Sequence, residues 1–124
     1  WYVRAQRIRT VWAAEVAACF DRFDVLLAPA TPFVAPEIGT ETVVIDGTTL
    51  AARPALGRLT QPLTPTGLPI AVAPIWPDGG PLPIGVQLIG PAGDEVRLLT
   101  VLTSLDEAGV ATSPVAAGPA AESP

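Results

Sequence analysis

The sequence predicts an α/β fold, and it predicts that this chain holds only part of one. Helical spacing of apolar residues near both ends, strand-length apolar runs between them, and clusters of glycine and proline at the boundaries support the fold class. Apolar residues make up 49% of the 124 residues, and charged residues only 15%. That balance leaves too little charge to cover the whole surface of an independent domain.

The first predicted helix spans residues 1–23, because apolar residues recur there every three or four positions. These residues are Ile8, Val11, Trp12, Val16, Cys19, Phe20 and Phe23. Arg4, Arg7 and Arg9 lie in the first turns, against the helix dipole, and no Ser, Thr, Asp or Asn caps the start. We therefore expect the helix to begin upstream of Trp1, and the chain to be a fragment.

A short buried strand is predicted at residues 25–28, where an apolar run precedes a proline-rich loop. Residues 42–50 predict a hairpin, because Asp46 and Gly47 together supply the positive φ angles of a type I′ turn. Residues 51–58 are expected to form one helical turn that leads into the next loop.

Two more buried strands are predicted at residues 68–73 and 84–89, separated by a turn rich in glycine and proline. Gly85, inside the second strand, indicates close approach of another backbone. The last helix is expected to begin after an Asp94 cap and to stop at Gly109. Its expected buried face consists of Val96, Leu99, Leu102 and Leu105, flanked by Leu98 and Val101.

The composition excludes several classes of function. A net charge of −5 opposes binding to nucleic acid, and no apolar run approaches the roughly 20 residues of a membrane span. The absence of His rules out Ser-His-Asp chemistry and His-ligated metal within this chain. We therefore expect no metal site in this chain. A single cysteine forms no internal disulfide and favours a reducing compartment such as the cytoplasm.

The titratable side chains have structural explanations. Asp21 and Asp24, and likewise Asp94 and Glu95, lie at predicted helix ends, where capping accounts for them. Cys19 lies on the apolar stripe of the first helix without a histidine to activate it, so we interpret it as a packed thiol.

The stretch 59–74 carries the most specific pattern, because hydroxyl and amide side chains alternate with prolines before a strand. Two interpretations are open: hydrogen bonding within a turn, or polar contacts that line a pocket. Two arginines just before the stretch either bind a substrate carboxylate in a bidentate pair or lie in solvent. The candidate pocket residues are Arg53, Arg58, Thr60, Gln61, Thr64 and Gly67.

Three motifs resemble the amidase signature family of hydrolases. They are Phe23-Asp-Val-Leu-Leu-Ala-Pro-Ala-Thr-Pro32, Gln61-Pro-Leu-Thr-Pro-Thr-Gly-Leu-Pro-Ile-Ala-Val72 and Leu82-Pro-Ile-Gly-Val-Gln-Leu-Ile-Gly90. The resemblance covers residues 5–109 and corresponds to the C-terminal quarter of such an enzyme. It implies an α/β fold in which helices enclose a mixed β-sheet. We expect residues 1–111 to belong to that one domain and residues 112–124 to be a disordered tail.

The resemblance also implies a reaction. A Ser–cis-Ser–Lys triad hydrolyses an amide C–N bond through an acyl-enzyme, without histidine, metal or cofactor. None of these catalytic residues is in this chain, which contains no lysine and no Gly-Ser-Ser run. In the family they lie upstream. The chain is then expected to be inactive alone and to contribute a pocket wall and core strands.

Within the family, the Val44-Ile-Asp-Gly47 ribbon and Arg53-Pro-Ala-Leu-Gly57 are similar to the 1-carboxybiuret hydrolase type. That type implies a small anionic amide as substrate and a small partner subunit, and it is compatible with a homo-oligomer. Gly57 stands where the related amidotransferases carry a substrate-binding aspartate, and Thr64 stands where asparagine is common.

Three alternatives remain open. The chain could be a non-catalytic acidic α/β module that binds a partner through its sheet. It could be a fragment of a glutaminase similar to the A-type subunits of amidotransferases, or the remnant of a decayed gene. A lysine and a Gly-Ser-Ser stretch upstream in the same reading frame would support the enzyme.

Overall fold

A computed structural model describes residues 1–77 and 80–114. The predicted order of helix, strand, hairpin, strand, strand and helix is confirmed. The elements are α1 (Tyr2–Ala18), η1 (Cys19–Asp21), β1 (Leu26–Pro29), β2 (Thr42–Ile45), β3 (Thr48–Ala51), α2 (Ala52–Leu56), η2 (Thr64–Thr66), β4 (Ile70–Ile75), β5 (Ile84–Ile89) and α3 (Glu95–Glu107).

Strand β5 is the centre of a three-stranded sheet with the order β1-β5-β4. Both of its ladders are antiparallel, so that Leu88 pairs with Leu27 on one side and with Ala71 on the other. Strands β2 and β3 form a separate antiparallel hairpin. Because side chains alternate along a strand, β5 presents Leu88 to one face of the sheet and Gln87 and Ile89 to the other.

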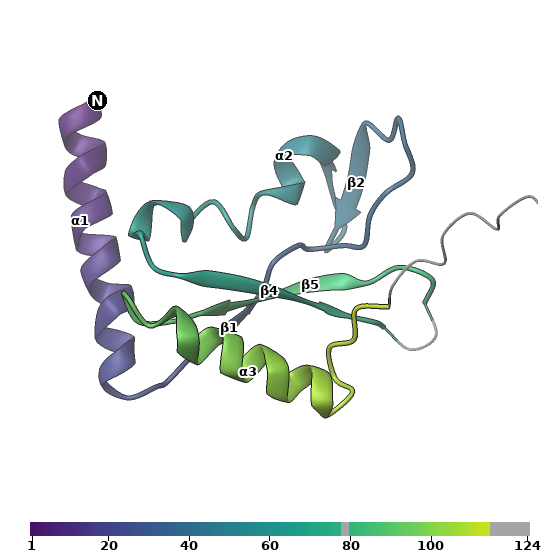
Figure 1. The fold of residues 1–124 in the computed structure, drawn as a ribbon. Coiled ribbons are helices and arrows are strands. Elements are labelled where there is room, and N and C mark those ends of the chain that lie inside the picture. Colours follow the sequence, from purple (N-terminus) through teal and green to yellow (C-terminus); the bar gives the residue numbers. More distant parts are fainter. Residues whose placement is uncertain (78–79, 115–124) are drawn as a thin grey trace, which may run out of the picture.

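Helix α3 covers the Leu88 face of the sheet (Figure 1). Leu98 is buried there and packs beside Gly90, where an added Cβ would lie 3.0 Å from its Cγ. The prediction for this helix was wrong at two positions, since Val96 is 73% exposed and Leu99 is 60% exposed. Because Gly90 has no side chain, Leu98 fits against the strand and lies at the centre of the buried face of α3. Val101, Leu102 and Leu105 extend this face at helical spacing.

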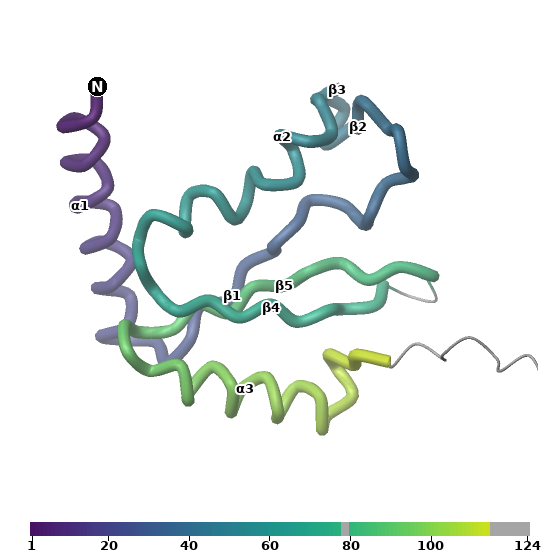
Figure 2. Tube along the Cα trace, turned by 45° about the horizontal axis from the view of Figure 1, so that its top comes forward, coloured from purple at the N-terminus to yellow at the C-terminus, as the bar shows by residue number. Residues whose placement is uncertain are grey.

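The hairpin, α2 and the segment 57–67 lie on the opposite face of the sheet (Figure 2). The expected close approach at Gly85 is confirmed: its carbonyl accepts a 2.7 Å hydrogen bond from the Ala30 amide. A Cβ at Gly85 would lie 3.1 Å from the Ala30 Cβ. The absence of a side chain at this position therefore lets Ala30, which follows β1, lie close beside the central strand.

Helix α1 stands at one end of the sheet (Figure 1) and contacts η2. The Trp12 indole donates to the Pro62 carbonyl at 2.6 Å, and Arg9 Nε donates to the Pro65 carbonyl at 2.6 Å. The expected buried stripe is wrong within this chain: Val16 is buried, but Ile8 and Val11 are about three-fifths exposed. One short element covers only part of the apolar face of a long helix.

Strands β1 and β4 are also less buried than predicted. Leu27 is 66% exposed and Val72 is 56% exposed. Both strands lie at edges of the three-stranded sheet, so each lacks a neighbour on one side. The nine buried apolar residues among those described include only four that are larger than alanine, namely Val16, Leu88, Ile89 and Leu98. Uncovered faces of this kind match the expectation that the chain completes a larger core.

The predicted hairpin turn and the predicted stop of the last helix are confirmed, whereas the capping role expected of Asp21 and Asp24 is not observed, because no side chain among the described residues caps α1 or η1 and Asp24 pairs with Arg97. Asp46 and Gly47 have φ angles of 48° and 71°, as a type I′ hairpin turn requires. Gly109 has a φ of 69° just after α3. Most of the tail predicted to be disordered, from residue 115 on, lies outside the described residues. At its start, the Thr112 carbonyl accepts a hydrogen bond from the Trp76 indole at 2.9 Å.

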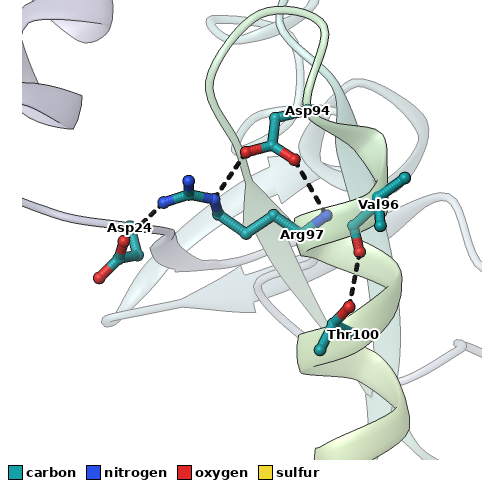
Figure 3. A network of polar contacts seen from close by, with 5 residues as sticks. All are labelled: Asp24, Asp94, Val96, Arg97 and Thr100. Atoms are coloured by element: carbon teal, nitrogen blue, oxygen red, sulfur yellow. Dashed lines mark hydrogen bonds and ion pairs between the residues drawn. The ribbon is translucent and has the colours of Figure 1, made fainter.

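Arg97 ties the first turn of α3 to the loop before β1 (Figure 3). Its Nε lies 2.7 Å from Asp94 Oδ2, and its Nη1 lies 2.5 Å from Asp24 Oδ1. Asp94 also accepts the Arg97 backbone amide at 3.2 Å, which confirms the predicted N-cap. Asp94 therefore caps α3 and also orients Arg97, which in turn contacts Asp24.

Asp94→Ala should destabilise the start of α3 by about 1 kcal/mol, because the cap and its contact with Arg97 are both lost. Asp24→Ala should cost well under about 1 kcal/mol, because that side chain is 91% exposed. Hydrogen exchange at the Arg97 amide in the intact protein measures both effects. Equally fast exchange in the two variants would show that the cap contributes nothing of its own.

Candidate functional site

The threonines of the segment 57–67 use their hydroxyls to shape the segment itself. Thr60 Oγ1 donates to the Gly57 carbonyl at 3.3 Å, and Thr64 Oγ1 donates to the Thr60 carbonyl at 3.1 Å. Thr66 Oγ1 donates to the Leu63 carbonyl at 2.6 Å. Each bond reaches back by one helical turn. The observed role is therefore the turn-forming one, with hydroxyl lone pairs left over as acceptors.

Two glycines allow the course of this segment. Gly67 has a φ of 76°, and an added Cβ would have no neighbour within 4 Å. The left-handed φ angle, rather than a close neighbour, therefore requires glycine at this position. At Gly57, an added Cβ would lie 2.8 Å from Gln61 Nε2. The absence of a side chain at Gly57 thus makes room for the Gln61 carboxamide to fold back over the segment.

A cavity of about 330 Å³ lies between the hairpin, α2 and this segment. Its lining residues are mostly apolar, and Arg58 and Gln61 are the two polar residues among them. The lining residues are Leu50, Ala51, Pro54, Ala55, Arg58, Gln61 and Pro62. Two of the six pocket residues predicted from the sequence, Arg58 and Gln61, therefore meet at one cavity.

A second cavity, of about 300 Å³, adjoins the first and shares Leu50 and Arg58 with it. It is lined by Pro32, Ile45, Asp46, Thr48, Leu50, Arg58 and Leu59. Arg58 is the single basic residue in either lining. Arg53 is exposed on α2 and belongs to neither lining, so the structure does not bring the two predicted arginines together here.

Gln87 is a residue that the sequence reasoning did not single out. It is 1% exposed and the only buried polar side chain among the described residues. Its Nε2 donates to the Pro29 carbonyl at 3.0 Å and to the Leu59 carbonyl at 3.1 Å. The available signal was its place inside an apolar strand, where a polar side chain needs a partner.

The described residues hold no reacting group with a partner base. They contain no group of three His, Cys, Asp or Glu side chains that could hold a metal ion. Cys19 is half-buried rather than packed as predicted, and its Sγ lies 3.6 Å from the Glu15 carbonyl one helical turn earlier. Among residues 1–77 and 80–114, no helix combines the length and apolar character that a bilayer span requires. The described residues therefore form a candidate pocket wall and no complete catalytic centre.

Comparison with curated proteins finds similar sequences among the subunits of amidases and amidotransferases. The chain is 46% identical over 112 residues to AtzE, the 1-carboxybiuret hydrolase subunit of Pseudomonas sp. (strain ADP), covering 90% of this chain and 24% of that protein. It is 38% identical over 104 residues to the A-type subunit of the glutamyl-tRNA(Gln) amidotransferase of Neisseria meningitidis serogroup C (strain 053442), covering 80% of this chain and 19% of that protein. The chain thus spans about a quarter or less of these relatives.

Solved structures support the same relationship. One, from a vestigial protein complex at the origin of an s-triazine catabolic enzyme, matches with a TM-score of 0.84 and 46% identity over 90% of this chain and 24% of its own. Another, of an amidase, matches with a TM-score of 0.78 and 30% identity over 88% of this chain and 25% of its own. The family model described as Amidase matches residues 1–99. The chain therefore belongs to the amidase family.

Proposed function

We propose that the chain is the C-terminal part of an amidase that hydrolyses a C–N bond of a small linear amide. The observation that carries the proposal is the 46% identity to a 1-carboxybiuret hydrolase subunit, maintained over 90% of this chain with a TM-score of 0.84 to a solved structure. The match extends through the sheet and also through the hairpin, α2 and the segment 57–67, which line the first cavity.

The chemistry of such an enzyme would come from residues outside this chain. By the family resemblance, a lysine acts as base, a bridging cis-serine relays the proton, and a second serine attacks the amide carbonyl. The C–N bond breaks as the amine leaves with a proton, and water then hydrolyses the acyl-serine. The chain contains no lysine, so its own residues would bind and orient substrate.

Arg58 is the residue that we propose to recognise the substrate. Arg58 lines two adjacent cavities, and the other polar residues in their linings are Gln61 on the first and Asp46 and Thr48 on the second. Such a site suits a small amide with a carboxylate at one end, because arginine binds carboxylates in a bidentate pair. The relative named for 1-carboxybiuret acts on a substrate of that kind. Thr60, Thr64 and Gly67 would shape the wall that carries Arg58.

A glutaminase of the amidotransferase type is the second candidate, because such a protein shares 38% identity with this chain. Gly57 stands where the resemblance places the aspartate that binds the amino group of glutamine. This substitution favours a substrate without that amino group. Both kinds of relative are named as subunits, which supports a partner subunit here as well. The single cysteine is compatible with the cytoplasm.

Arg58→Ala in the full-length enzyme should raise KM for an anionic amide about 10- to 100-fold, because a charge-assisted contact to the carboxylate is lost. Arg53→Ala, which removes an exposed arginine outside the cavity, is the matched control and should leave KM near the parent value. Steady-state kinetics with an anionic and a neutral amide measure both. An unchanged KM of the Arg58 variant for the anionic amide would rule out this role.

The isolated 124-residue chain should neither hydrolyse amides nor unfold in a sharp cooperative transition. It lacks a lysine base, and its edge strands and α1 expose apolar side chains that need cover. Calorimetry and an amide hydrolysis assay on the chain, beside the full-length enzyme, test this. A soluble monomer with a sharp transition would contradict the fragment interpretation, and hydrolysis by the chain alone would contradict the assignment of catalysis.

A further inference from the structure

The Gln87 carboxamide joins three parts of the molecule that are distant in the sequence. It projects from the central strand β5 toward the face opposite α3. Its Nε2 donates both to the Pro29 carbonyl at the end of β1 and to the Leu59 carbonyl in the segment 57–67. The first partner is 58 residues away and the second is 28 residues away. One amide group therefore links the central strand, an edge strand and the cavity wall.

The orientation of this carboxamide follows from its partners. Both are backbone carbonyls, which only accept hydrogen bonds, so the NH₂ group must face them. The opposite orientation would place three oxygens together. Gln87 Oε1 then points away, and it has no hydrogen-bond partner among the described residues although it is buried. A buried acceptor without a hydrogen-bond partner costs free energy. The stabilising contribution of the Gln87 carboxamide therefore comes from the two hydrogen bonds that it donates.

The bond to Leu59 attaches the cavity wall at a specific point. The backbone hydrogen bonds beside it, such as Gln61 N to the Gly57 carbonyl at 2.9 Å, run within the segment. The two bonds from α1 attach the segment further along, at the Pro62 and Pro65 carbonyls, so the Gln87 bond is the one that holds it next to Arg58. Leu59 directly follows Arg58, and it lines the second cavity together with that arginine. Moving the Leu59 carbonyl would therefore move the backbone from which the Arg58 side chain projects.

We infer that Gln87 is a positioning residue, which holds Arg58 at the cavity by tethering the Leu59 carbonyl to the central strand. The inference rests on the proposed function for its kinetic consequence. The tether itself, the hydrogen bond from Gln87 to the Leu59 carbonyl, does not depend on the proposed function. Loss of the tether should weaken recognition of the carboxylate end of a substrate and leave the reacting centre in place. A purely structural role would instead affect anionic and neutral substrates alike.

The kinetic test compares Gln87→Met with Leu88→Val in the full-length enzyme. Methionine is similar in length but cannot donate, and Leu88 is the next residue on β5 but faces α3. Gln87→Met should raise KM for an anionic amide about tenfold, with kcat and the KM for a neutral amide nearly unchanged. Leu88→Val should show no such difference between substrates. An equal change for both substrates in Gln87→Met, or no change, would overturn the inference.

A second measurement tests the tether without activity. Hydrogen exchange at the amides of Gln61 and Thr64 should be at least several-fold faster in Gln87→Met than in the parent or Leu88→Val, because the segment is released from the sheet. Gln87→Asn has a side chain one methylene shorter, which cannot reach the two carbonyls, and it should show the same faster exchange as Gln87→Met. It replaces Gln87→Met in this test if the methionine variant does not fold. Unchanged exchange overturns the inference, whereas absence of amidase activity in the parent overturns only the proposed function.

Discussion

The alternation of side chains along β5 is the constraint on which the rest of the structure depends. Leu88 is fully buried against the α3 side, while its neighbour Gln87 is buried against the segment 57–67. The same strand is hydrogen-bonded to a neighbour on both edges. A shift of one residue in its register would exchange the two faces, placing a carboxamide in the apolar core and a leucine against backbone carbonyls. The helix layer and the cavity wall are thus held in register by one strand.

Some apolar surfaces of the molecule are covered by other elements, and others are exposed. The α3 face has a contiguous apolar core, but Leu27 and Val72 on the edge strands and Ile8 and Val11 on α1 are exposed. The low charge of the whole sequence agrees with these exposed apolar side chains. The relatives are about four to five times longer than the matched segment. Their additional residues are the natural candidates to cover such faces in a complete enzyme.

The candidate site illustrates how a loop can present a few polar groups on an apolar wall. The threonine hydroxyls donate their hydrogen bonds to backbone carbonyls within the turns. These hydroxyl protons are therefore not free to bind a ligand. Glycine at 57 leaves space for the Gln61 side chain, and Arg58 lies at both cavities. The family explains the absence of a reacting group here, since its catalytic serines and lysine lie elsewhere. The wall would contribute specificity, and the missing part would contribute the chemistry.

The sequence by itself determined the features that depend on neighbours within a few residues. The hairpin turn at Asp46, the Asp94 cap and the Gly109 helix stop all follow from local hydrogen bonding and allowed φ angles. Its three motifs also determined the family. Only the tertiary structure decided that Leu98 centres the buried face of α3 and that Arg58, rather than Arg53, lies at the cavity. It also revealed the partners of Gln87. These outcomes depend on contacts between groups that are far apart in the chain. The local periodicity of the sequence does not specify which distant groups come into contact when the chain packs.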